Sequence, residues 1–297
     1  MKSARLCALF LVSIVSIAYE LYVMRFFSIS GWESFGSLVI SAALLGTGLA
    51  GIVLCFLSER VEKNADNILA ALAISLPLFM PLATLAGGAV PFNPVFLASD
   101  AKQWLYIGIY YIVYGIPFFV AAMFTGISFI TMRNDIQKVY FANMLGSGLG
   151  GFIIILFMFW LPPRLLILPI TFIAIAAALF ACVSRDGETG RLEYSVPWIL
   201  LLFVSSSLSI FITFSRGNIP VSDYKAVSYV RKYPDSRLVH HSWGPGGEYH
   251  VYYSKFFHFA PGLSDNASIS IDSISSQPYW GLFIDGSGPV GIMGYLR

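Results

Sequence analysis

Charged residues are scarce in this 297-residue chain. They make up 11% of it, whereas an average soluble domain carries roughly 25%. Hydrophobic residues make up 57%, and the mean hydropathy is +0.74. A surface with so little charge cannot be mostly exposed to water, so the composition predicts a membrane protein. The net charge of +2 and the lack of a basic block argue against nucleic acid as a partner.

Cysteine and histidine are also rare. The three cysteines, Cys7, Cys55 and Cys182, all lie in apolar runs, which excludes a disulfide framework or a cysteine-based metal site. The four histidines are His240, His241, His250 and His258. Their spacing matches no helical histidine pair and no cysteine or carboxylate cluster joins them, so we expect hydrogen-bonded or exposed histidines and no metal site.

Long apolar runs are abundant. A membrane-spanning helix needs about 20 apolar residues, and seven runs satisfy this: 6–28, 35–57, 68–90, 105–130, 141–161, 165–183 and 196–214. Each must be helical in lipid, because only a helix satisfies its own backbone groups there. The first run could also be a signal peptide cleaved after Ala18. Because apolar residues continue to Phe27, we expect it to be retained as a span.

Basic residues in the short connections predict the orientation. Eight lie on the side of the N-terminus: Lys2, Arg5, Arg60, Lys63, Arg133, Lys138, Arg185 and Arg191. Only Lys102 and Arg164 lie on the other side. The imbalance predicts a cytoplasmic N-terminus in a bacterial inner membrane, and seven spans then put the region after Phe214 outside. One span more or fewer would return that region to the cytoplasm.

A few polar and small residues stand out within the spans. Glu20 is the one acid deep in a span, and Arg25 could pair with it or extend toward the membrane surface. A structural role for Glu20 is favoured over proton transport, because proton transport usually needs a chain of titratable groups and Glu20 is a single acid. Asn143 is a candidate for a hydrogen bond between helices.

Glycines in the second and fifth spans favour close helix packing. Gly146 and Gly150 belong to a formal GxGxxG pattern, but it lies within an apolar span and not after a strand, so a dinucleotide site is not expected. Spacing of small residues by four instead predicts close helix contact, and Gly46 and Ala50 repeat the arrangement.

The region after residue 214 changes character. We expect domains at 1–214, a helical bundle, and at 215–297, a β-rich module. A short helix is expected within 221–233 with Ser222 as its N-cap. Strands are expected at 237–241 and 249–254, joined through the glycine-rich segment 244–247, and at 281–284, followed by a turn at Asp285-Gly286.

Several short segments resemble membrane-fused spermidine synthase-like proteins. In the spans they are Tyr19-Glu20 with Arg25, and Tyr140-Phe-Ala-Asn143-Met-Leu-Gly146. In the module they are Ile219-Pro-Val-Ser-Asp-Tyr-Lys-Ala-Val-Ser-Tyr-Val-Arg-Lys-Tyr-Pro-Asp-Ser-Arg237, Trp243-Gly-Pro-Gly-Gly-Glu-Tyr-His-Val-Tyr-Tyr-Ser254, Ala260-Pro-Gly-Leu-Ser264 and Leu282-Phe-Ile-Asp285-Gly286. The last is similar to the strand and turn that close the β-module of aminopropyltransferases.

The resemblance implies an incomplete enzyme. In that family a Rossmann-like domain follows the β-module, binds decarboxylated S-adenosylmethionine and supplies the acidic catalytic residues. No Gly-rich strand–turn–helix follows Asp285-Gly286 here, and Ser287 to Val290 stand where the family often has a glutamine. We therefore expect no catalytic, cofactor-binding or metal residues in this chain.

Two functions stay open at this point. The chain is expected to be the membrane-anchored N-terminal portion of a spermidine synthase-like protein, inactive alone and dependent on a separate Rossmann-like subunit. That subunit would bind the donor beside a surface lined by Tyr249, Tyr252, Tyr253 and Tyr279. The alternative is a non-enzymatic membrane scaffold, or a transporter-like bundle, with an extracytoplasmic β-module. No inverted repeat of the kind found in transporters is evident.

Overall fold

The structure, a computed structural model, describes residues 2–31, 36–185, 192–194, 196–215, 217–255 and 280–292. Within them, seven helices are long and apolar enough to cross a membrane. They are α1 (Lys2–Ser30), α2 (Gly36–Lys63), α3 (Ala65–Ala89), α4 (Lys102–Thr131), α5 (Ile136–Trp160), α6 (Ile167–Ala181) and α7 (Val196–Ser215). They match the predicted spans one for one, and only the ends differ by a few residues.

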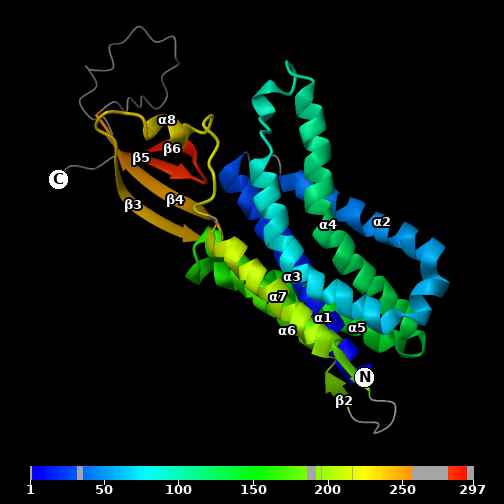
Figure 1. The fold of residues 1–297 in the computed structure, drawn as a ribbon. Coiled ribbons are helices and arrows are strands. Elements are labelled where there is room, and N and C mark those ends of the chain that lie inside the picture. Colours follow the sequence, from blue (N-terminus) through cyan, green and yellow to red (C-terminus); the bar gives the residue numbers. More distant parts are fainter. Residues whose placement is uncertain are drawn as a thin grey trace.

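Helix α1 is the centre of the bundle. It packs mainly against α5 and α6, and α3 packs against α4, α6 and α7, while α2 lies on α4 (Figure 1). Tyr19 and Val23 of α1 are almost completely buried. Helix α1 thus contributes a large share of the bundle's core.

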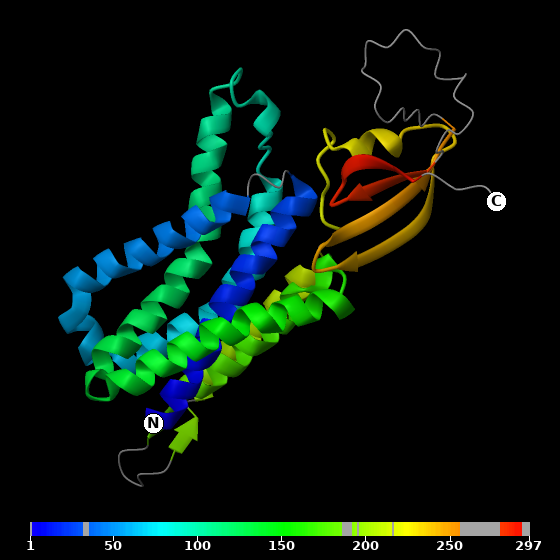
Figure 2. The same cartoon turned by 180° about the vertical axis from the view of Figure 1, so that it is seen from behind.

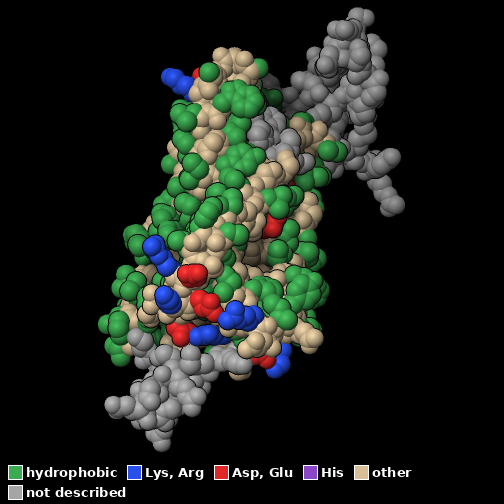
Figure 3. All heavy atoms as spheres, turned by 90° about the vertical axis from the view of Figure 1, so that its right-hand side faces the viewer, with side chains coloured by type: hydrophobic (Ala, Val, Ile, Leu, Met, Phe, Trp, Pro, Cys, Tyr) green, Lys and Arg blue, Asp and Glu red, His purple; other side chains and the backbone are tan. Residues whose placement is uncertain are grey.

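Large apolar side chains cover the outside of the bundle. Phe56, Trp160 and Phe203 are each more than two-thirds exposed, at 84%, 71% and 71%. Figure 3 shows the hydrophobic side chains spread along the helices, with most Lys, Arg, Asp and Glu gathered toward one end. A water-soluble monomer does not expose apolar surface on this scale, so the arrangement fits a bundle surrounded by lipid.

The C-terminal module is an antiparallel sheet of four strands in the order β3-β4-β5-β6. The strands are β3 (Arg237–Gly244), β4 (Gly247–Tyr253), β5 (Trp280–Ile284) and β6 (Ser287–Ile292). Pro245 and Gly246 turn β3 into β4. The short helix α8 (Ala226–Val230) packs on the sheet, and Val227, Val230, Tyr252 and Phe283 form a small core beneath it.

The sheet lies at the end of the bundle opposite the N-terminus, beside the connection between α5 and α6 (Figures 1 and 2). The amide of Ser222 donates a hydrogen bond to the carbonyl oxygen of Ser30 at 2.9 Å. Arg164, in the α5–α6 connection, donates to the Asn218 side chain at 3.1 Å. The module is thus attached to the bundle by direct contacts as well as by the chain that follows α7.

Three details differ from the sequence expectations. The helix expected within 221–233 is only the short α8. Its N-cap position is occupied by Lys225 and not by Ser222, whose amide donates a hydrogen bond to the Ser30 carbonyl oxygen of α1. Strand β6 was not predicted, since it contains Gly288, Pro289 and Gly291; as an edge strand it tolerates proline. The short strands β1 (Val183–Arg185) and β2 (Leu192–Tyr194) between α6 and α7 were also missed.

Candidate functional site

A buried ion pair joins the β-module to the bundle. Nη1 of Arg25, near the C-terminal end of α1, lies 2.6 Å from Oδ2 of Asp285 in the β5–β6 turn. The side chains of Arg25 and Asp285 are only 9% and 5% exposed. Ser28 Oγ donates to the same carboxylate oxygen at 2.7 Å, and the amide of Glu248 donates to Oδ1 at 2.7 Å. All these contacts converge on one carboxylate, which fixes the turn against α1.

The turn itself has an unusual backbone. Asp285 has φ = 51° and Gly286 has φ = 76°, both in the left-handed region. Aspartate and asparagine enter this region more easily than other non-glycine residues, and glycine enters it freely. The Asp-Gly pair therefore suits the tight turn and also aims the carboxylate at α1.

Lys225 is a second buried cation at this junction. It is 1% exposed, and its Nζ donates hydrogen bonds to the carbonyl oxygens of Ser28 and Asp285. The Ser28 carbonyl lies in the last turn of α1, where the helix dipole is negative and favours cations. Lys225 thus bridges the membrane helix and the β-turn through their backbones, beside the ion pair of Arg25.

Arg25 therefore has a different partner from the one expected from the sequence. It pairs with Asp285, 260 residues further along the chain, and not with Glu20. Its Nε and Nη2 have no partner within the described part of the chain. Glu20 is half-buried in α1, and no hydrogen bond or ion pair to it is found among the described residues.

The small residues of the spans lie at helix contacts. A Cβ atom on Gly146 would lie 2.4 Å from the Phe10 carbonyl oxygen, and one on Gly150 would lie 2.5 Å from that of Ile14. Helices α5 and α1 thus touch backbone to backbone. Ser13 of α1 donates to Asn143 of α5 at 2.9 Å beside this contact. On α2, Gly46 abuts the backbone of α4 in the same way, and Ala50 is buried.

Two histidines and a glutamate come together on the sheet. His241 on β3 lies directly opposite His250 on β4, and their rings stack with centroids 4.4 Å apart. Glu248 Oε1 lies 2.8 Å from His241 Nε2 and 3.8 Å from His250 Nε2. One oxygen and two ring nitrogens, all able to bind a metal ion, thus lie within 4.8 Å of one another.

A cavity of about 500 Å³ lies in front of this cluster. One wall is the sheet, with His241, Glu248, His250 and Tyr252, and the other is the bundle end, with Ile29 and the Pro162-Pro163-Arg164 connection. Arg231 reaches the cavity from the end of α8 and donates from Nε to the Tyr252 hydroxyl at 3.0 Å. The cavity therefore has a mixed polar and apolar lining and lies where the module meets the membrane-spanning part.

His250 is mostly buried. Burial lowers its pKa below the ordinary value, with the charges of His241 and Arg231 acting in the same direction and Glu248 opposing them. The ring is therefore neutral near pH 7. Its Nδ1 is buried without a hydrogen-bond partner in the part of the chain that the structure describes.

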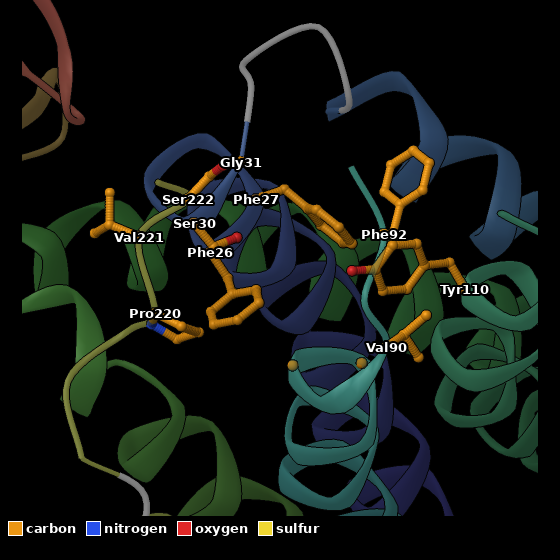
Figure 4. Close-up of a pocket in the computed structure, with 12 residues that line it drawn as sticks. Phe26, Phe27, Ser30, Gly31, Val90, Phe92, Tyr110, Pro220, Val221 and Ser222 are labelled. Carbon is orange, nitrogen blue, oxygen red and sulfur yellow. The ribbon is translucent and has the colours of Figure 1, made fainter. Parts of the chain in front are cut away.

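A second, mostly apolar hollow of about 180 Å³ lies at the same end of the bundle (Figure 4). Phe26 and Phe27 of α1, Phe92 and Tyr110 surround it, and the segment Pro220-Val221-Ser222 forms the side toward the module. The rings of Phe27 and Phe92 pack edge-on against Tyr110 at 5.6 and 5.3 Å. Its size and lining suit a small apolar group.

Sequence reasoning missed the histidine–glutamate cluster. Pairing of β3 with β4 brings these residues together, and their spacing in the sequence follows no helical repeat. The signal available was the hairpin: pairing through Pro245-Gly246 puts His241 opposite His250. Of the other expected site residues, His258, Tyr279 and the segment 260–264 lie outside the described residues. Tyr249, Tyr252 and Tyr253 all lie on β4, with Tyr252 buried in the small core.

Comparison of the chain with models of known protein families, with curated proteins and with solved structures finds no match in any of the three.

Proposed function

We propose that this chain is an integral membrane protein that holds a β-module rigidly at the extracytoplasmic membrane surface, where the module serves as a binding or assembly platform. The observation that carries the proposal is the position of the module at the end of a seven-helix bundle opposite the N-terminus. Combined with the excess of basic residues on the N-terminal side, this arrangement supports an outward-facing module.

The structure gathers several of the basic residues counted above at the N-terminal end of the bundle. At the N-terminal end, Arg5 pairs with Asp66, and Arg133 lies 3.4 Å from Glu62. These exposed pairs belong to the short connections in which basic residues set the topology. At the other end, the connection between α5 and α6 contributes only Arg164 to the basic count.

Rigid attachment favours a platform over a mobile domain. Arg25, Ser28 and Lys225 hold the β5–β6 turn through buried contacts. These contacts set the orientation of the sheet, and with it the orientation of the cavity beneath it. A ligand or partner in that cavity would touch the module and the bundle at once.

Reporter fusions test the orientation. A reporter that is active only outside the cytoplasm should be active when fused after Phe214, and inactive when fused in the α2–α3 connection after Lys63. A reporter that folds only in the cytoplasm should give the reverse pattern. Cytoplasmic activity at the Phe214 junction would overturn the proposal.

A second candidate function rests on a different observation. Arg25 and Asp285 belong to two segments that separately resemble spermidine synthase-like proteins, and they meet in one buried contact. This favours a membrane-anchored N-terminal portion of such a protein, which would need a separate nucleotide-binding domain to transfer an aminopropyl group. Decarboxylated S-adenosylmethionine would then be a substrate held by that domain.

An activity assay tests this second candidate. The chain in detergent would be mixed with the donor, a diamine acceptor and the nucleotide-binding domain of a soluble aminopropyltransferase lacking its own β-module. Formation of methylthioadenosine only when both proteins are present would support the candidate. Turnover by the chain alone would contradict the need for a second domain, and no turnover in the mixture would count against the candidate itself.

A further inference from the structure

We propose that His241, Glu248 and His250 form a binding site for a divalent transition-metal ion, with Zn²⁺ as the best fit, open to the cavity between the module and the bundle. The inference is independent of the membrane orientation argued above, because all three ligands lie on the sheet. Two imidazole nitrogens and one carboxylate are the donor types that Zn²⁺ prefers, and three protein ligands leave a fourth position for water or a ligand.

Strand pairing brings the donors together. His241 and His250 are cross-strand partners, and Glu248 lies two residues before His250 on the same face of β4. The backbone of Glu248 is held by two hydrogen bonds with Asp285, one at each of its amide and carbonyl groups, at 2.7 and 2.8 Å. The site is therefore built on paired strands and not on a loop, which limits the movement of its ligands.

The distances are close to those of a bound ion. Ligand atoms around a tetrahedral Zn²⁺ lie about 3.4 Å apart, given bonds of about 2.0–2.1 Å. Glu248 Oε1 is 2.8 and 3.8 Å from the two Nε2 atoms. The stacked rings differ by only 13° in plane, so at least one must turn about its outer torsion to direct its lone pair at a shared ion. His241, which is 36% exposed, has room to do so.

Nε2 of His250 is the ring nitrogen that faces Glu248, and it accepts no hydrogen bond from that residue. The His250 side chain is 12% exposed, its Nδ1 has no partner, and its Nε2 lies beyond hydrogen-bond distance of Glu248. An ion bound to Nε2 would face the cavity, which supplies the space for the ion and its fourth ligand.

The test is Zn²⁺ binding to the full chain in detergent, prepared without a histidine tag so that no added histidine competes. Titration calorimetry should give one equivalent of Zn²⁺. Substitutions His241→Ala, Glu248→Gln and His250→Ala should each weaken binding by at least about 10-fold, the lower limit found even for outer-shell changes at such sites. His240→Ala is the matched control, because His240 is the exposed neighbour of His241 on β3 and is not in the cluster. It should bind Zn²⁺ normally.

A second measurement needs no variant. Zn²⁺ should protect His241 and His250 of the native chain from an imidazole-modifying reagent, with modification read by mass spectrometry, and should leave His240 reactive. Co²⁺ in place of Zn²⁺ should give the visible d–d bands of a low-coordinate site. Absence of stoichiometric binding by the native chain, or equal protection of His240, would overturn the proposal and leave a hydrogen-bonded histidine cluster.

Discussion

The substitution Asp285→Asn tests how the module is attached to the bundle. Asparagine has nearly the same shape as aspartate and also tolerates the left-handed backbone of this turn, so the change removes mainly the negative charge. Arg25 would then remain buried after losing the carboxylate with which it pairs. Removing one partner of a buried pair costs about 3–5 kcal/mol. The asparagine oxygen can still accept one hydrogen bond, so we expect the low end, about 3 kcal/mol.

An energy of this size changes the population of the detached module by a factor of roughly 100 or more, since each 1.4 kcal/mol corresponds to tenfold. Lys225 reports on that population. Its side chain is 1% exposed and can react with an amine-modifying reagent only when the module separates from α1. In detergent, the modification rate of Lys225, measured by mass spectrometry and divided by that of exposed Lys232, should rise by about the same factor.

Two further variants make the result specific. Asp223→Asn removes an exposed aspartate of the same module and should leave the Lys225 rate unchanged. Adding Arg25→Met to Asp285→Asn removes both charges of the pair and should recover part of the lost protection, because the uncompensated cation is gone. A Lys225 rate that is the same in the native chain and in Asp285→Asn would refute the attachment through this ion pair.

Three other predictions concern the bundle and the module. Gly146→Ala should lower the free energy of unfolding of the detergent-solubilised protein, measured by thermal unfolding, by about 1–3 kcal/mol, because the added Cβ would overlap the α1 backbone. Gly148 faces open space, so Gly148→Ala should leave this free energy unchanged. Asn143→Ala should cost only about 0.6 kcal/mol, the average for a hydrogen bond between membrane helices, and a larger loss by chemical unfolding would show a further role. Hydrogen bonds from Ser254 and Lys255 lower the pKa of Asp235, so its stabilising contribution is present above the unfolded pKa of about 4 and disappears as the pH falls through the folded value. Asp235→Asn should abolish this part of the acid dependence of module unfolding, followed by tyrosine and tryptophan fluorescence.

The spans could be predicted because the membrane imposes a simple physical constraint. A helix that crosses lipid must be long and apolar, and each of the seven runs satisfied that condition without reference to any other part of the chain. The close contact of α5 with α1 follows similarly from glycines spaced by four, since only residues without bulk allow backbones to meet. The spans and the capacity for close helix contact depend on local composition, so both could be predicted from the sequence.

The junction and the histidine cluster could not be predicted in the same way. The partner of Arg25 lies 260 residues further along the chain, and nothing in the spacing of Glu20 and Arg25 indicates that an aspartate of another domain takes the place of the nearer acid. The His241–His250 pairing depends on the register of one hairpin, and a shift of one residue would move these side chains to opposite faces. Strand β6 was not predicted because it contains glycine and proline, which disfavour strands except at the edge of a sheet.

The central claim, that the β-module faces away from the cytoplasm, is tested most directly by cysteine labelling in intact cells. Cys7, Cys55 and Cys182 would be replaced by alanine, and a single cysteine introduced at exposed Asp223 in the module or at exposed Lys63 at the end of α2. A membrane-impermeant maleimide should label Asp223→Cys in intact cells and Lys63→Cys only after the cells are permeabilised. Labelling of Asp223→Cys only after permeabilisation would contradict the account and would favour the aminopropyl-transfer candidate.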